Sequence, residues 1–261
     1  MSYVVIKCGG SILEQLPETF YKSILQLVKD YQLKPIIVHG GGPEISNLLE
    51  QMEIETTFMN GLRVTTEPVL DVVEMVLSGS VNKKISRKLT ACGGKAVGIS
   101  GIDGSLLLGK QKDSDLGFVG DILSVKHDIV KELLNENYIP VISPLALDEN
   151  GQRLNINADT AASAIAKALN AQLWMITNVP GVMKQDKVIS QLTLDEVEQL
   201  IDEKIITGGM IPKVHAACEC IESGVKEVVI INGLEENGLL KLASGKQIGS
   251  KIIGKEVLIN G

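Results

Sequence analysis

The chain has 261 residues, of which 44% are hydrophobic and 22% are charged, and its formal net charge is -7. This length is enough to bury a full core, and the composition is that of an ordinary globular protein. Because the net charge is negative and no apolar run approaches the roughly 20 residues that cross a bilayer, we expect no nucleic-acid partner, no membrane partner and a cytoplasmic location.

Apolar, strand-like runs alternate with helical patterns along most of the chain, which indicates an α/β fold with a mainly parallel sheet. A soft boundary near Ala171 separates an N-terminal from a C-terminal lobe. The predicted strands are Tyr3–Cys8, Pro35–His39, Ala96–Ser100, Ile139–Ser143, Leu173–Thr177 and Glu227–Asn232. The predicted helices are Pro17–Tyr31, Pro43–Gln51, Glu67–Ser78, Val81–Ala91, Ile129–Asn135, Asp159–Leu169, Leu194–Ile201, Pro212–Glu222 and Glu236–Ala243.

Two stretches interrupt this alternation. Residues Glu55–Thr65 form a predicted β-hairpin, because the central Asn60-Gly61 pair suits a type I′ turn. Leu106–Val125 is a second, looser antiparallel excursion. We expect both at the rim of the sheet, where substrate-binding loops are usually built.

Two of the predicted strands run directly into glycines. The segments are Lys7–Ser11 and His39–Pro43, and a later Gly208-Gly209 pair precedes Lys213. Glycine lets the backbone approach a ligand closely, and free amides where a strand turns into a helix attract anions. Two such loops and two lysines therefore predict a site for a phosphate chain. The P-loop, dinucleotide and protein-kinase signatures are absent from the sequence, as is the nucleophile motif of an esterase.

Five motifs in order along the chain resemble the amino acid kinase family, and the resemblance covers nearly the whole chain. Two segments, Gly61–Thr65 and Asn155–Asp159, resemble the members that act on N-acetyl-L-glutamate. The resemblance implies a three-layer αβα sandwich around a mainly parallel open sheet, in two lobes. Residues 1–171 would bind the acid and form a homodimer, and residues 172–261 would bind ATP. The five motifs are Lys7–Ser11, Val38–Pro43, Asn155–Asp159, Thr177–Val182 and Gly208–Lys213.

The resemblance implies transfer of the ATP γ-phosphoryl group to the γ-carboxylate of N-acetyl-L-glutamate, on the route to arginine. It implies Mg²⁺ carried by the ATP phosphates rather than by a protein metal site. The implied catalytic residues are Lys7 and Lys213, Asp159 holding both lysines, and the backbone N–H groups of Gly10 and Gly41. The implied acid-binding residues are Gly41, Gly42, Arg63, Asn155 and Asn157. The implied nucleotide-binding residues are Asn178, Val179, Pro180, Gly181, Val182, Met183, Ile205, Ile206, Thr207, Gly209 and Met210.

Elementary chemistry agrees with such a site independently of the resemblance. A carboxylate is already ionised at neutral pH and needs no general base, so the lack of a convincing catalytic histidine is expected. Phosphoryl transfer needs in-line positioning and neutralisation of charge, which two lysines and two glycine loops provide. Arg63 suits a substrate carboxylate because its planar fork binds both oxygens at once.

Several of these residues also have simpler expected roles. Asp159 is expected to cap the helix that follows it, and Asn155 and Asn157 are typical loop residues. An apolar stripe on the helix Glu67–Ser78 is expected to serve both the core of the chain and a subunit interface. Its members are Val69, Val72, Val73 and Val76.

The chain departs from the family pattern at Asn178, where related kinases commonly carry an aspartate, so a negative charge near the nucleotide is lost. It begins two residues before the first predicted strand and so resembles the short, arginine-insensitive dimeric type.

Two other functions stay open: a sister kinase for an aminoadipate-type acid, and a non-catalytic nucleotide sensor on the same scaffold. A sensor is expected to have lost Lys7, Asp159 or Lys213, and all three are present. A dinucleotide-binding oxidoreductase is a distant third, because its glycine fingerprint is missing.

Overall fold

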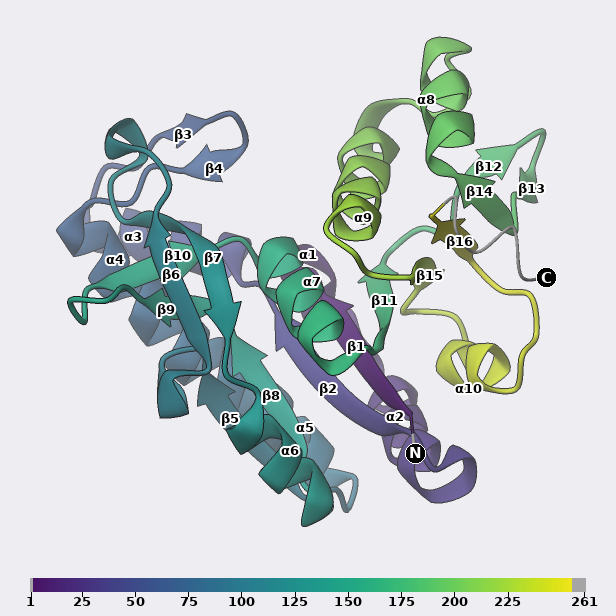
Figure 1. Ribbon diagram of the computed structural model, residues 1–261, viewed down its shortest axis with the longest axis horizontal. Helices are drawn as coiled ribbons and strands as arrows, with labels where there is room; N and C mark the ends of the chain where they lie inside the picture. Colours follow the sequence, from purple (N-terminus) through teal and green to yellow (C-terminus); the bar gives the residue numbers. More distant parts are fainter. Residues whose placement is uncertain (1, 255–261) are drawn as a thin grey trace.

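The central sheet has the strand order β14-β16-β15-β11-β1-β2-β8-β5 in the computed structural model, which describes residues 2–254 (Figure 1). All six predicted strands are present and run parallel to their neighbours among the six. They are β1 (Tyr3–Cys8), β2 (Lys34–His39), β5 (Ala96–Ser100), β8 (Ile139–Ser143), β11 (Gln172–Thr177) and β15 (Glu227–Asn232). Two short strands were not predicted, β14 (Gln191–Thr193) and β16 (Ser250–Ile253), and β16 pairs antiparallel with β15. The sheet is thus mainly parallel, with an antiparallel addition at one edge.

Helices occupy the predicted positions, with one addition and one correction. The addition is the short helix α1 (Gly10–Leu13), which continues from β1. The correction concerns the break expected between Ser78 and Val81: a π-helical segment, Met75–Val81, joins α4 to α5 there without interruption. The other helices are α2 (Glu18–Tyr31), α3 (Gly42–Gln51), α4 (Glu67–Glu74), α5 (Asn82–Ala91), α6 (Asp128–Asn135), α7 (Ala158–Leu169), α8 (Leu194–Asp202), α9 (Ile211–Glu222) and α10 (Gly238–Ala243).

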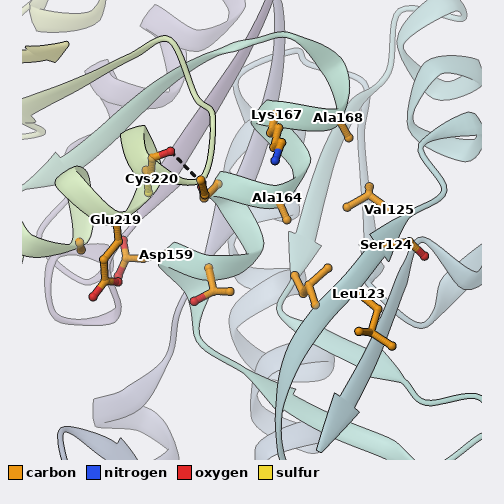
Figure 2. Close-up of a pocket in the computed structure, with 14 residues that line it drawn as sticks. Leu123, Ser124, Val125, Asp159, Ala164, Lys167, Ala168, Glu219 and Cys220 are labelled. Carbon is orange, nitrogen blue, oxygen red and sulfur yellow. Dashed lines mark hydrogen bonds between the residues drawn. The ribbon is translucent and has the colours of Figure 1, made fainter. Parts of the chain in front are cut away.

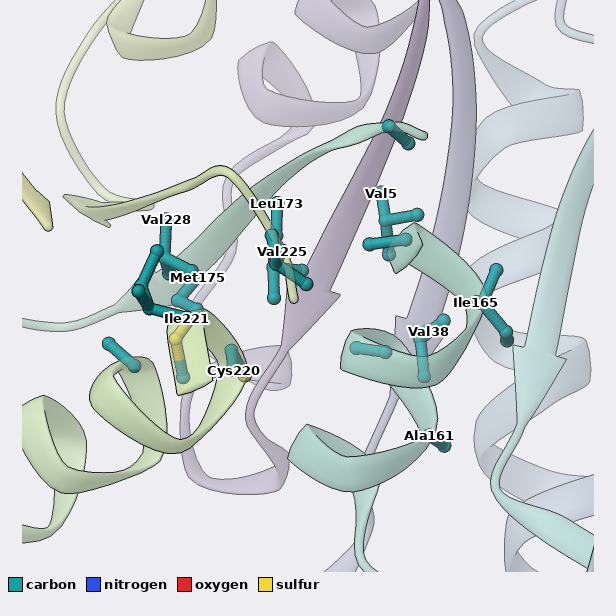
Figure 3. Close-up of a cluster of buried hydrophobic side chains, with 14 of the residues drawn as sticks. Val5, Val38, Ala161, Ile165, Leu173, Met175, Cys220, Ile221, Val225 and Val228 are labelled. Atoms are coloured by element: carbon teal, nitrogen blue, oxygen red, sulfur yellow. The ribbon is translucent and has the colours of Figure 1, made fainter. Parts of the chain in front are cut away.

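The two faces of the sheet pack into two separate cores, which makes the three-layer sandwich. Figure 3 shows one core, where Val5, Val38 and Met175 of the strands meet Ile165 of α7 and Ile221 of α9. The other core lies on the opposite face and holds buried residues of α2, α3, α4 and α5. Successive side chains of a strand point to opposite faces, so β1 presents Lys7 on the side of Val5 and α7.

The valine stripe on α4 and the π-helical segment belongs to the second core. Val69, Val72, Val73 and Val76 are each no more than 2% exposed within the chain itself. The expectation that part of this stripe forms a subunit interface is therefore wrong for these four residues. Their burial against the chain's own sheet leaves no surface for a partner.

The two predicted excursions form the rim structures that the pattern indicates. Phe58–Met59 (β3) and Leu62–Arg63 (β4) make the hairpin, and Asn60 and Gly61 have φ of 51° and 79°, as a type I′ turn requires. The second excursion supplies the antiparallel strands β6 and β7 of a small closed sheet with the order β10-β7-β6-β9. The strands of this sheet are β6 (Leu107–Gln111), β7 (Val119–Val125), β9 (Leu145–Leu147) and β10 (Arg153–Ile156). A further hairpin joins β12 (Met183–Lys184) to β13 (Lys187–Val188).

In Figure 1 the small sheet and the β3–β4 hairpin lie on one side of α7, and α8, α9, β15, β16 and α10 lie on the other. The division into lobes at residues 1–171 and 172–261 stays a prediction, and residues 255–261 lie outside the described residues. Within residues 2–254, no helix has both the length and the apolar character needed to cross a bilayer.

Candidate active site

The two glycine loops that follow β1 and β2 touch each other. A Cβ placed on Gly10 would lie 2.9 Å from Gly42 N and 3.0 Å from Gly41 N. Gly40 N donates to Cys8 O over 3.0 Å, which fixes one strand end against the other. Only glycine at position 10 permits this approach, so the two loops present their backbone amides side by side.

Lys7 and Asp159 meet beside these loops. Lys7 Nζ lies 2.9 Å from Asp159 Oδ1, and the side chains are 14% and 23% exposed. The contact is an ion pair without hydrogen-bond alignment, because Asp159 Oδ1 is buried and has no hydrogen-bond partner. A carboxylate oxygen in this position has lone pairs to spare for a second cation.

The expected capping role of Asp159 is wrong. Asn157 is the N-cap of α7, and its side-chain oxygen accepts from Asp159 N at 2.7 Å and from Thr160 N at 3.2 Å. Capping needs a short polar side chain just outside the helix, and Asp159 already lies inside the first turn. Its carboxylate is therefore free of the helix end and directed at Lys7.

Lys213 lines the same cavity as this ion pair. The cavity has a volume of about 210 Å³, and its walls include Lys7, Asp159, Asn178, Gly209 and Lys213. Lys213 Nζ donates to Gly209 O over 3.0 Å. In residues 2–254 no ion pair joins Lys213 to Asp159. The predicted cluster of two ammonium groups and one carboxylate thus borders one cavity, with Asp159 paired to Lys7.

A second cavity, of about 200 Å³, has Gly40, Gly41 and Gly42 of the second glycine loop in its wall. We call it the Arg63 cavity, and we call the first one, lined by Lys7 and Lys213, the lysine cavity. Asn157 and Ala158 form part of the wall of the Arg63 cavity, while Asp159, the next residue, lines the lysine cavity. All five predicted acid-binding residues line this second cavity, together with Phe58 and Leu62 of the hairpin. They are Gly41, Gly42, Arg63, Asn155 and Asn157.

Arg63 is a nearly buried cation in this second cavity. It is 8% exposed, and desolvation lowers the pKa of its guanidinium. It donates to Gly42 O at 3.2 Å and to Ser46 Oγ at 2.6 Å. It also donates to Thr56 Oγ1 at 3.2 Å, and its Cζ lies 4.6 Å from the centre of the Phe58 ring. None of the ion pairs in the described part of the chain involves Arg63, so a ligand carboxylate would compensate its charge.

Two residues beside Arg63 were not singled out from the sequence. Ser46 is an isolated serine within α3, and nothing in its sequence neighbourhood signals the bond to Arg63. Thr65 donates to Arg63 O at 2.8 Å and accepts from Asn155 Nδ2 at 3.0 Å. It lies in the hairpin motif, which is the signal that points to it. Through Thr65 the hairpin is tied to β10.

The predicted nucleotide-binding residues are more dispersed. Asn178 and Gly209 line the lysine cavity. Val182 and Ile206 are buried in the core, so their side chains are not available to a ligand. Gly181 has φ of 145° and packs against Ser250, which explains the glycine there. The binding roles of this set stay predictions.

A cavity of about 480 Å³, larger than either of these two, lies elsewhere (Figure 2). It is a groove bordered by β7, α7 and α9, with Leu123, Lys167 and Cys220 among its lining residues. Asp159 reaches one end of it, but neither glycine loop nor the lysine pair does. Chemistry therefore favours the two smaller cavities as the active site.

Comparisons with known proteins identify the family of the chain. A model of the amino acid kinase family matches residues 2–232. The acetylglutamate kinase of Oceanobacillus iheyensis is 44% identical over 98% of this chain and 99% of its own length. That of Geobacillus thermodenitrificans is 49% identical over 88% of this chain and 90% of its own length.

A solved structure, that of smu.665 from Streptococcus mutans UA159, has the same fold. It superposes with a TM-score of 0.81 at 32% identity, over 96% of this chain and 98% of that one. The family match and these near-full-length relatives support one conclusion. This chain belongs to the amino acid kinase family.

Proposed function

We propose that the chain is a kinase that transfers the γ-phosphoryl group of ATP to the γ-carboxylate of N-acetyl-L-glutamate, in arginine biosynthesis. The observation that carries the proposal is a pair of cavities, one bordered by Gly41 of the second glycine loop and the other by Gly9 of the first, and these two loops touch each other. One has Arg63 and Asn155 in its wall, and the other has Lys7, Asp159 and Lys213. Relatives named acetylglutamate kinase, which match nearly the whole chain, support this substrate.

The acceptor needs placement rather than deprotonation. A γ-carboxylate is ionised at neutral pH and attacks phosphorus directly. Arg63, held by Gly42 O and Ser46, would bind the α-carboxylate and direct the γ-carboxylate toward the Gly10–Gly41 contact. The apolar side chains of Phe58 and Leu62 in the wall would exclude water from the acceptor.

The transferred group carries negative charge, which this site can balance. Lys7 and Lys213 would approach its oxygens from the lysine cavity, and the Gly10 and Gly41 amides would donate to it. Asp159, paired with Lys7, would keep the ammonium group in place. Preorganised donors of this kind are often the largest single contribution to catalysis.

The residues present fit a nucleotide triphosphate with its metal. A Cβ at Gly10 would fill the space between the glycine loops, and Asp159 Oδ1 has no hydrogen-bond partner. Gly10, Lys7 and Lys213 would hold the phosphates, and Asn178 would lie beside the nucleotide. Mg²⁺ bound to the phosphates supplies further charge neutralisation. We propose in addition a homodimer in the cytoplasm.

A hydroxylamine-trapping assay tests the proposed reaction. Hydroxylamine converts an acyl phosphate to a hydroxamate, which gives a coloured iron complex. The protein is offered MgATP with N-acetylglutamate, glutamate, aspartate or N-acetyl-aminoadipate. Colour with N-acetylglutamate alone is the expected result. Colour with another acid instead would identify that acid as the substrate. No colour with any of the four acids, from protein that is folded and binds ATP, would overturn the kinase assignment.

A further inference from the structure

His39 is a fully buried histidine to which the proposed reaction gives no part. It immediately precedes the Gly40–Gly42 loop and is 0% exposed. Its Nδ1 lies 3.0 Å from Gly40 O, and its Nε2 lies 3.3 Å from Asn82 Nδ2. Both ring nitrogens therefore have partners, one in the glycine loop and one at the start of α5.

The contacts of Asn82 establish which nitrogen of His39 carries the proton. Asn82 Nδ2 lies 2.8 Å from Val141 O and 3.1 Å from Ile99 O. Carbonyl oxygens only accept, so the atom that faces them is the amide nitrogen, a donor, and it offers no acceptor to a proton on His39 Nε2. His39 then carries its proton on Nδ1 and donates it to Gly40 O. Lys83 Nζ, 3.2 Å from Asn82 Oδ1, supports the same amide orientation.

The bond to Gly40 O orients a whole peptide unit. A trans peptide is planar, and its C=O and N–H point in opposite directions. Holding the Gly40 carbonyl toward His39 therefore directs the Gly41 N–H away from His39. No backbone acceptor for this N–H is found among the described residues. The Gly41 nitrogen is one of the two that lie against Gly10 at the contact of the two loops, the other being Gly42 N.

Packing around this unit leaves little freedom. A Cβ on Gly41 would lie 2.8 Å from Leu77 Cδ2 and 3.2 Å from Val81 Cγ2, so the π-helical segment presses on the loop. A Cβ on Gly98 would lie 1.8 Å from Asn82 Oδ1, so Asn82 occupies space that only a glycine leaves. His39 and Asn82 are thus built into the sheet and the helix that carry the loop.

We propose that His39, held in one tautomer by Asn82, is a positioning residue that aims the Gly41 N–H at the transferred phosphoryl group. The aim of the N–H rests on the proposed function, whereas the tautomer and the peptide orientation do not. The chemistry of His39 is that of a neutral donor to a carbonyl, and it exchanges no proton with substrate.

The first test is spectroscopic and uses the wild-type protein. The chain has three histidines, so long-range ¹H–¹⁵N correlation of histidine-labelled protein resolves each ring. His39→Asn identifies the signals of His39 by their loss. The expected result at pH 7 is the neutral ring protonated on Nδ1. A His39 ring protonated on Nε2, or a charged imidazolium, overturns the proposal.

The second test is kinetic. We expect His39→Leu to lower kcat about 10- to 100-fold, which is no more than the decrease caused by removing one preorganised donor. The KM for each substrate should stay within about threefold of the wild-type value. Asn places its amide nitrogen near the position of Nδ1, so His39→Asn is expected to recover most of kcat. A wild-type kcat in His39→Leu overturns the proposal, as does a failure of His39→Asn to exceed it.

The control variant is His127→Leu, at the N-cap of α6 on the opposite face of the sheet, which is expected to retain wild-type kcat. A wild-type protein that gives no acyl phosphate overturns the proposed function. The tautomer measured on the same protein decides the His39 geometry separately.

Discussion

Lys7 Nζ of β1 and Asp159 Oδ1 of α7 lie 2.9 Å apart, and this ion pair connects the central sheet to a helix whose first two residues line different cavities, Ala158 the Arg63 cavity and Asp159 the lysine cavity. We expect Asp159→Asn to lower kcat about 10²-fold, the scale of one lost preorganised interaction, because Lys7 loses the charge that holds it. KM should change little. Steady-state kinetics of Asp159→Asn test this expectation. The control is Asp128→Asn, because Asp128 is an exposed aspartate on α6. A raised KM at unchanged kcat would contradict the assignment.

Arg63 and Lys213 are expected to affect different kinetic parameters. Truncation of a buried, hydrogen-bonded partner costs several kcal/mol, so Arg63→Ala should raise KM for the acid about 10²-fold or more. Lys213→Ala should mainly lower kcat, by about 10²- to 10³-fold. Arg63→Lys is the matched control, which keeps the charge but loses the fork. The reverse pattern of kcat and KM in steady-state kinetics would break both role assignments.

The contact of the two glycine loops should not tolerate a side chain at position 10. In Gly10→Ala the new Cβ meets backbone nitrogens at 2.9 and 3.0 Å and Pro43 Cδ at 3.0 Å. The loops must move apart, so kcat should fall by at least about 10²-fold, and the melting temperature should fall as well. Gly79→Ala, where nothing lies within 4 Å, is the control for stability. Wild-type activity in Gly10→Ala would show that the amides need not adjoin.

Asn157 has two assigned roles, in capping α7 and in lining the Arg63 cavity, and its variants separate these roles. Asn157→Ala should lower the free energy of unfolding by about 1 kcal/mol, the usual cost of a lost N-cap. Asn157→Asp retains the capping oxygen and should recover that stability, while its new negative charge raises KM for an acidic substrate. Urea unfolding and kinetics measure the two effects independently. Equal stability of the alanine and aspartate variants would mean that the cap contributes nothing.

His39 makes the stability of the protein depend on pH. Burial lowers the pKa of His39 to about 4, with the charge of Lys83 acting in the same direction and the bond to Gly40 opposing it. The unfolded chain has a histidine pKa near 6.5 and so binds a proton that the native state does not. Stability therefore falls as the pH is lowered from about 6.5 to 4, by up to about 3 kcal/mol from this residue.

Urea unfolding at pH 7.0, 5.5 and 4.5 measures this dependence. His39→Asn has no ionisable group at this position, so its free energy of unfolding should fall less steeply over the same range. Identical slopes in the wild type and His39→Asn would show that His39 is not held neutral in the native protein.

Much of the fold could be predicted because local pattern and tertiary structure agree. β1, β2, β8, β11 and β15 are apolar runs bounded by polar or glycine segments, and all were identified. The strands β14 and β16 were missed, since each is short and is defined by pairing with a partner far along the chain. The break expected near Gly79 was wrong because the buried side chains of the π-helical segment keep the helix intact against the sheet.

The candidate site was predictable to the extent that it consists of glycine loops and charged side chains in motifs. Lys7, Arg63 and Asn155 could be singled out in this way, and each lines a cavity. The contributions of Ser46 and Asn82 could not, because a single serine or asparagine within a helix carries no local signal. Their partners are defined only when the fold brings Arg63 of the hairpin beside α3 and His39 of β2 beside α5.

The hairpin and the small sheet supply part of the wall of the Arg63 cavity and none of the residues that line the lysine cavity. Phe58 and Leu62 come from the hairpin and Val119 from β7, whereas Lys7 and Asp159 come from the central sheet and α7. Under the proposed function, the part of acceptor recognition that the hairpin and the small sheet provide would be encoded separately from the lysines that act on the phosphoryl group. Divergence confined to the hairpin and the small sheet can change the accepted acid while the inherited transfer chemistry is preserved.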